Sequence, residues 1–344
     1  RQGVRIAILG LVTENTPRVT LPQNVAHLDF PDAATVANQW IPRLVPDQAD
    51  LVVLLSHIGG FVDRDTGEIE GHMVDLAERV TGEAAVVGGH THRQVHGVMD
   101  DGTVLLEAGS SGRWVARADL VWDPTLRSVT SATTEMVTVF ADSIEAHAEV
   151  ARMVASYRTE VAPVLDEVLG EAGAELWASR DECPMGNLVS DVQRDAADVD
   201  FAFQNPGGVR ASIGEGTIRF SDVYKVMPFD NTIVTATLTG AEVRTLLEEA
   251  VGDGSFLHVA GLRYAVDYDR PRGSRVTSLT RSDCEALVPA ADYTVAYNNF
   301  MGQGGDSLPV VTYRDDEYDT GVLIRDAMAD WIRKRGTPVV AEVE

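Results

Sequence analysis

The first third of the chain alternates short apolar runs with amphipathic segments. Aliphatic or β-branched runs predict buried strands at 4–9, 51–55, 84–87 and 104–106. Between them, 32–45 begins with Asp32 as an N-cap, and 71–80 carries apolar residues at helical spacing. Both segments predict helices that cover the sheet. The alternation indicates a layered α/β domain, for which we set the limits 1–140.

A long helical pattern follows this domain. Apolar residues recur near one face from Ser143 to about Leu169, and Pro163 predicts a kink or a break. We interpret 141–172 as a helix that connects two domains.

The rest of the chain, 173–344, mixes the two kinds of pattern without regular alternation, which favours an α+β domain. Predicted helices cover 185–197 and 239–251, and predicted strands cover 232–238 and 292–298. The expected architecture is therefore an α/β sandwich joined by a long helix to an α+β domain.

Composition narrows the class of partner. The 344 residues suffice for two domains, and the formal net charge of −25 repels a polyanion, which argues against a nucleic acid partner. A small anionic ligand can still be held by local arginines. No apolar run approaches the roughly 18 to 20 residues that cross a bilayer, so we predict no transmembrane segment.

The two cysteines leave one question open. Cys183 and Cys284 lie far apart in the sequence and no CxxC motif occurs, which excludes a thiolate zinc site. They are either two free thiols or one disulfide, and a disulfide would imply an oxidising compartment.

Three histidines follow predicted strands. His57 lies in "SHIGG" after the second strand, and His90 and His92 lie in "GGHTH" after the third. Ligand groups of an α/β sheet gather at the carboxyl ends of its strands, and alternate residues of an extended segment point to the same side. Imidazole suits transition metals, so we expect a metal site here. The alternative is that these are ordinary loop histidines bonded to backbone carbonyls.

Several motifs occur in an order typical of one family. "LSHIG", "GGHTH" and "LLEAGSSGRWVARADLVWD" resemble the later half of the calcineurin-like metallophosphoesterase domain of 5′-nucleotidases. "CPMGNLVSD", "FQNPGGVRASI", "FSDVYKVMPFDNTIV" and "NNFMGQGGDSLPV" resemble that family's C-terminal substrate-binding domain. The resemblance covers almost the whole chain. It implies a partial metallophosphoesterase domain followed by a 5′-nucleotidase C-terminal domain.

The resemblance also implies roles for individual residues. Two divalent metal ions, Zn, Mn or similar, would be bound, one by His57 and His90 and the other in part by His92. Arg210 would contact the phosphate and Asp306 the ribose hydroxyls. The other residues that match substrate-binding positions are Asn205, which contacts substrate, Phe229 and Phe300, which sandwich the base, and Asn231, which bonds to the base.

Simpler interpretations exist for three of these residues. Phe229 follows Pro228 and could pack in a core, Asp306 could belong to a turn, and Arg210 could form a surface salt bridge. On the functional interpretation, guanidinium offers a fork of donors to phosphate, and a carboxylate accepts hydrogen bonds from a diol.

One part of the family pattern does not occur. The chain contains no Asp-x-His and no Asn-His, the segments that supply the bridging carboxylate and the transition-state histidine in this family. We expect the sequence to begin after those segments, and so to contain no catalytic residue and to be inactive alone.

The predicted function is hydrolysis of a nucleoside 5′-monophosphate, a small-molecule substrate, to nucleoside and phosphate. The alternatives are a 2′,3′-cyclic nucleotide or nucleotide-sugar phosphoesterase, and a non-catalytic nucleotide-binding protein. The resemblance further implies a secreted, periplasmic or cell-surface location.

Overall fold

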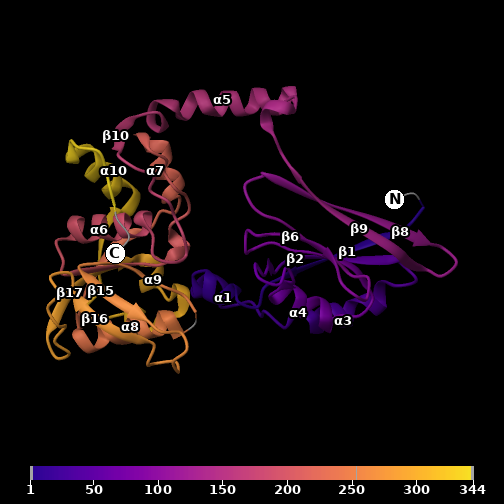
Figure 1. Ribbon diagram of the computed structural model, residues 1–344, viewed down its shortest axis with the longest axis horizontal. Helices are drawn as coiled ribbons and strands as arrows, with labels where there is room; N and C mark the ends of the chain where they lie inside the picture. Colours follow the sequence, from indigo (N-terminus) through magenta and orange to yellow (C-terminus); the bar gives the residue numbers. More distant parts are fainter. Residues whose placement is uncertain (1–2, 253, 342–344) are drawn as a thin grey trace. The chain divides into compact units, whose positions relative to one another are not determined.

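The computed structural model describes residues 3–252 and 254–341, and the chain divides into two compact units (Figure 1). The first unit comprises Arg1–Pro17 and Ala26–Ala148, and the second comprises Arg18–Val25 and Glu149–Glu344. The short segment Arg18–Val25 is grouped with the second unit. The Gln23 amide donates a hydrogen bond to the Gln303 side chain at 3.4 Å.

A five-stranded sheet of order β1-β2-β5-β7-β6 organises the first unit. The first four of these strands run parallel, and β6 pairs antiparallel with β7. The strands and helices of this unit are β1 (Ile6–Val12), α3 (Ala33–Leu44), β2 (Leu51–His57), β3 (Phe61–Val62), β4 (Ile69–Glu70), α4 (His72–Arg79), β5 (Glu83–Val87), β6 (Gln94–Val98), β7 (Val104–Ala108), β8 (Trp114–Asp123), β9 (Ser128–Thr138) and the 3₁₀ turn η1 (Ala141–Ser143). The four predicted strands and two predicted helices of this unit are confirmed.

The two faces of this sheet are covered differently. Helices α3 and α4 pack on one face, and the β8-β9 hairpin covers part of the other (Figure 1). Asp32 caps α3 as predicted, because its carboxylate accepts a hydrogen bond from the Thr35 N–H at 2.8 Å. The long hairpin was not anticipated from the sequence.

The predicted connecting helix is shorter than 141–172. Helix α5 spans Ala148–Leu165 and is not interrupted at Pro163. Residues Val168–Ala172 instead form strand β10, which pairs antiparallel with β12 (Gly216–Arg219). The apolar pattern that we assigned to one helix thus continues into a strand. The apolar residues at the end of this pattern fit the spacing of a strand as well as that of a helix.

The second unit is built on a sheet of order β14-β11-β17-β13-β18, with mixed strand directions. This confirms the α+β prediction. The two helices and the two strands predicted in this half of the chain are present. Helix α1 (Thr16–Val19) spans the boundary between the two units. The remaining elements of the second unit are α2 (Pro22–Val25), α6 (Pro184–Ala197), β11 (Phe201–Gln204), η2 (Pro206–Gly208), α7 (Phe220–Val226), β13 (Thr232–Thr239), α8 (Gly240–Gly252), β14 (His258–Ala260), β15 (Leu262–Val266), β16 (Val276–Arg281), β17 (Asp292–Asn298), α9 (Asn299–Gly302), η3 (Gly305–Ser307), η4 (Pro309–Val311), β18 (Tyr318–Leu323) and α10 (Ile324–Arg335).

Two apolar cores lie on opposite faces of this sheet. One is formed with α6, α7 and α10, and the other with α8, β15 and β16 (Figure 1). The cores fix the ends of β11, β13 and β17, from which the predicted substrate-binding residues extend.

The cysteines are both free thiols. Cys183 is buried and caps α6, where its sulfur accepts a hydrogen bond from the Gly186 N–H at 3.3 Å, whereas Cys284 is exposed. Of the two alternatives drawn from the sequence, the structure thus has the free thiols. None of the helices among the described residues is both long and apolar enough to cross a membrane.

His258 is a buried histidine in the core of the second unit. Its side chain lies against Gly186 of α6 and is 1% exposed, and within residues 3–252 and 254–341 neither ring nitrogen has a hydrogen-bond partner. Burial penalises the imidazolium and lowers the pKa of His258 to about 4, against a smaller opposing effect of Asp181.

We therefore expect the second unit to lose stability as the pH falls from about 6.5 to about 4. The folded state binds the His258 proton more weakly than the unfolded state, so acid favours unfolding, by up to about 3 kcal/mol. Urea denaturation at pH 7.5 and pH 4.5 measures this loss. The variant His258→Leu should lose the part of this pH dependence of stability that His258 causes. An unchanged pH dependence in that variant would show that His258 is not its source.

Candidate functional site

The predicted metal-binding residues lie at the carboxyl edge of the parallel sheet. His57 is the last residue of β2, and Gly88 and Gly89 carry the chain from β5 to His90. Only glycine fits at position 88, because a Cβ there would overlap the Ile58 carbonyl oxygen and the end of the Met73 side chain. The loops after β2 and β5 therefore pack directly against each other.

The structure brings two of the three imidazoles together. The rings of His57 and His90 lie edge to face, with centroids 5.0 Å apart. Among residues 3–252 and 254–341, no three His, Cys, Asp or Glu side chains form a group that could hold a metal ion, so His92 does not complete such a group.

The prediction that His90 and His92 lie on an extended segment is wrong. Their φ angles are 80° and 58°, in the left-handed region that non-glycine residues rarely adopt. Strained backbone of this kind persists only where surrounding contacts hold it, and it clusters at functional sites.

Glu107 provides those contacts and was not identified from the sequence. It lies in β7, is 1% exposed, and its carboxylate faces Thr91, the residue between the two histidines. The signal available in the sequence was a charged residue inside an apolar strand, in "VLLEA".

The predicted substrate-binding residues lie in the second unit, where two of them form a direct contact. The Asn205 amide donates a 2.6 Å hydrogen bond to the Asp306 carboxylate, although the two residues are 101 positions apart. The Asn205 side-chain oxygen accepts hydrogen bonds from Gln204 at 2.9 Å and Asn298 at 2.8 Å. Asn205 thus holds Asp306 through a buried amide network.

Asp306 lies in the turn η3, as the simpler interpretation expected, and its side chain is half-buried. Its φ is 57°, and burial raises the pKa of its carboxyl, an effect that the Asn205 hydrogen bond and the positive charge of Arg180 partly offset. Arg180 was missed in the sequence, where it precedes the "CPMGNLVSD" motif. It adds a cation to the surroundings of this carboxylate.

Neither of the two predicted aromatic residues is fully buried in a core. Phe229 is 47% exposed, so the core-packing interpretation is wrong. Phe300 is half-buried, and its ring covers Gly305 so closely that a Cβ there would overlap it. Asn231, also half-buried, precedes β13, and its backbone oxygen accepts a hydrogen bond from the Ile324 N–H at 3.0 Å.

Arg210 is exposed beside Phe229. Its guanidinium carbon lies 6.0 Å from the centre of the Phe229 ring, and its Nη1 donates a 3.3 Å hydrogen bond to the Gly207 carbonyl. Within the described part of the chain Arg210 forms no ion pair, so the salt-bridge interpretation fails. Its charge is available to an anion.

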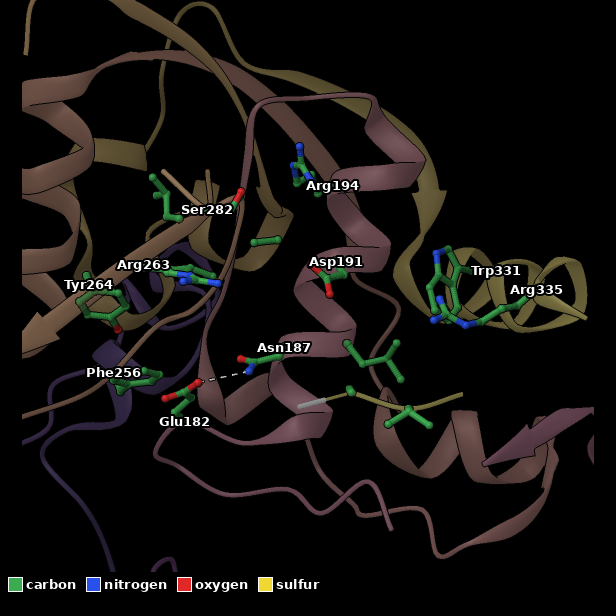
Figure 2. A pocket seen from close by; sticks show the side chains of 17 residues that line it. Glu182, Asn187, Asp191, Arg194, Phe256, Arg263, Tyr264, Ser282, Trp331 and Arg335 are labelled. Carbon is green, nitrogen blue, oxygen red and sulfur yellow. Dashed lines mark hydrogen bonds between the residues drawn. The ribbon is translucent and has the colours of Figure 1, made fainter. Parts of the chain in front are cut away.

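A separate cavity of about 420 Å³ lies between α6, β15 and α10 (Figure 2). None of the predicted substrate-binding residues lines it. Several of its polar side chains bond to the protein: Asn187 to Glu182 at 3.4 Å, Arg194 to the Asp200 carbonyl at 2.9 Å. These polar groups of the lining are thus already engaged within the protein.

Comparison with known proteins identifies similar chains. Residues 164–313 match the family model of the 5′-nucleotidase C-terminal domain. A 5′-nucleotidase precursor of Thermus thermophilus superposes with a TM-score of 0.88 at 28% identity, covering 99% of this chain and 72% of that one. The chain is thus similar to 5′-nucleotidases over almost its whole length, and its second unit matches their C-terminal domain. Its two-domain architecture of mixed α/β sheets is the one expected from the sequence.

The curated relatives that this chain resembles are longer than the chain itself. It is 28% identical to the trifunctional nucleotide phosphoesterase protein YfkN of Bacillus subtilis, over 99% of this chain and 24% of the relative. It is 24% identical to a 5′-nucleotidase of Vibrio cholerae, over 96% of this chain and 67% of the relative. The chain thus spans about a quarter of one relative and two thirds of the other.

Proposed function

We propose that this chain supplies nucleotide-binding and metal-binding parts of an enzyme that hydrolyses nucleoside 5′-monophosphates to nucleoside and phosphate. The observation that carries the proposal is the Asn205–Asp306 hydrogen bond beside an aromatic ring that covers Gly305. A fixed carboxylate next to an aromatic face suits a ribose diol attached to a planar base.

The second unit would bind the substrate. Asp306 would accept hydrogen bonds from the ribose hydroxyls, and Asn205 would keep its carboxylate oriented. Phe229 and Phe300 would stack on the base, with Asn231 bonding to its edge. Arg210 would donate to the phosphate, a role that suits a guanidinium without a carboxylate partner among the described residues.

The first unit would contribute ligands to two divalent metal ions, Zn, Mn or similar. The adjacent imidazoles of His57 and His90 fit as part of one ion's ligand set, and we assign His92 to the other ion. Such ions, when bound, would lower the pKa of bound water and balance phosphoryl charge, and the proposed attacking group is water rather than a protein nucleophile. This chain's part is to present the imidazoles on loops whose backbone is fixed.

Export of the protein is part of the proposal. A relative of 24% identity over 95% of this chain is named as a cell wall protein in Listeria monocytogenes. A secreted, periplasmic or cell-surface location also suits an enzyme that removes the phosphate which bars nucleotides from uptake.

Calorimetry with adenosine on the full chain tests the substrate site. Phe300→Ala should weaken binding about 10-fold or more, because a stacked base contributes roughly 1 to 3 kcal/mol. Phe140→Ala, an equally drastic change at an exposed phenylalanine of the first unit, is the control. Unchanged affinity in Phe300→Ala would exclude the proposed base site.

Phosphate release with added Zn²⁺ or Mn²⁺ tests the reaction. Adenosine 5′-monophosphate, 2′,3′-cyclic AMP and a nucleotide sugar distinguish the proposed substrate from the two alternatives. Adenosine binding that depends on Phe300, is unchanged by a chelator and is accompanied by no turnover would identify a nucleotide-binding protein instead.

A further inference from the structure

Glu107 occupies the centre of the loops that carry His57, His90 and His92. The Thr91 hydroxyl lies 2.8 Å from both Glu107 carboxylate oxygens and 2.9 Å from the Gly60 carbonyl oxygen, so its single proton has three neighbouring acceptors. The Gly60 N–H donates to Oε2 at 3.1 Å, and the Arg93 N–H donates to Oε1 at 3.3 Å. One carboxylate therefore fixes backbone from both loops.

The spacing around Glu107 allows little adjustment. A Cβ at Gly59 would overlap the Gly89 carbonyl oxygen and would lie 2.7 Å from Glu107 Oε2. The Cβ position of Gly89, in turn, is 3.6 Å from Nδ1 of His57. The carboxylate, the two glycines and the His57 ring thus form one closely packed group.

The position of Thr91 explains how the strained segment is held. His90 and His92 both adopt positive φ, and the residue between them is bonded to Glu107. Positive φ costs a non-glycine residue free energy, so the conformation requires compensating contacts. The Thr91 hydroxyl and the Arg93 backbone N–H both donate to Glu107, and these hydrogen bonds supply such contacts.

The electrostatics also favour a cation nearby. Glu107 is 1% exposed, and its carboxylate accepts hydrogen bonds from two N–H groups and one hydroxyl. A buried carboxylate is costly unless it is bonded or near a positive charge. A cation on the imidazoles of the same loops would be attracted by it.

We propose that Glu107 is a positioning residue that sets the orientation of His57 and His90 and strengthens cation binding there through Thr91 and the two loops. Metal binding by these histidines rests on the proposed function, whereas the orientation of the rings does not. Partners that bond outside the ligand shell typically change metal affinity by about 10- to 100-fold.

The test uses the full chain, with Mn²⁺ alone as the probe in calorimetry and the histidine ring signals in NMR. Glu107→Gln should weaken Mn²⁺ binding about 10-fold or more and shift the ring signals of His57 and His90. Glu78→Gln, which makes the same change on the exposed face of α4, should alter neither.

Thr91 provides a second pair of variants in case Glu107→Gln folds poorly. Thr91→Val removes the hydroxyl and should weaken binding and shift the ring signals, whereas Thr91→Ser retains the hydroxyl and should restore both. Glu107→Gln and Thr91→Val with wild-type signals and affinity would overturn the proposal. A wild-type chain that binds no Mn²⁺ contradicts the metal site instead, and the ring signals then still decide the role of Glu107.

Discussion

Replacing Gly186 with alanine is expected to destabilise the second unit by about 3 kcal/mol or more, near the upper end for an overpacked core. The new methyl group would overlap three atoms of the His258 ring, which is 1% exposed. Neither the backbone at Gly186 nor the strand that carries His258 can shift easily. Gly186 is in the first turns of α6, and His258 is paired with Gln204 in the sheet. The urea midpoint of the second unit, followed by hydrogen exchange in α6, measures the loss.

A second substitution shows whether the overlap is the cause. His258→Ala removes the ring, so the double variant should be more stable than Gly186→Ala alone even though His258→Ala is itself destabilising. Gly214→Ala is the control, because nothing lies within 4 Å of a Cβ at that position. Equal midpoints for Gly186→Ala and the wild type would show that the core adapts at no cost.

Much of the fold of this chain was predictable from local patterns. The strand-end position of His57 and the capping of α3 by Asp32 follow from apolar runs and from the polar residues that end them. These features depend on neighbours in the sequence. The end of α5 was not predictable in this way, because pairing of β10 with the distant β12 decides it.

The candidate site was predictable in its residue types but not in its geometry. A sequence shows that histidines follow strands, but the positive φ angles of His90 and His92 depend on Glu107 and on close glycine packing. The same limit applies to Asn205 and Asp306. Their contact depends on how β11 and β17 pair, and local periodicity does not encode that pairing.

Asn205→Asp is expected to abolish measurable nucleoside binding near pH 8, a loss of at least about 100-fold. The substitution places a second carboxylate where the amide now donates to Asp306 at 2.6 Å. Burial already raises the pKa of Asp306, and a like charge at this distance raises it further. The pair would then hold a shared proton or repel, and the diol would lose its oriented acceptor.

The pH dependence of this variant distinguishes the repulsion from a general loss of folding. Carboxyl pKa values raised in the folded state mean that folding takes up protons, so the variant should gain stability as the pH falls and lose it as the pH rises through those values. Uncompensated, a buried charge costs about 3 to 5 kcal/mol. Asn15→Asp, on an exposed side chain of the first unit, should show no such gain, and if Asn205→Asp behaves like it, the buried network is not what orients Asp306.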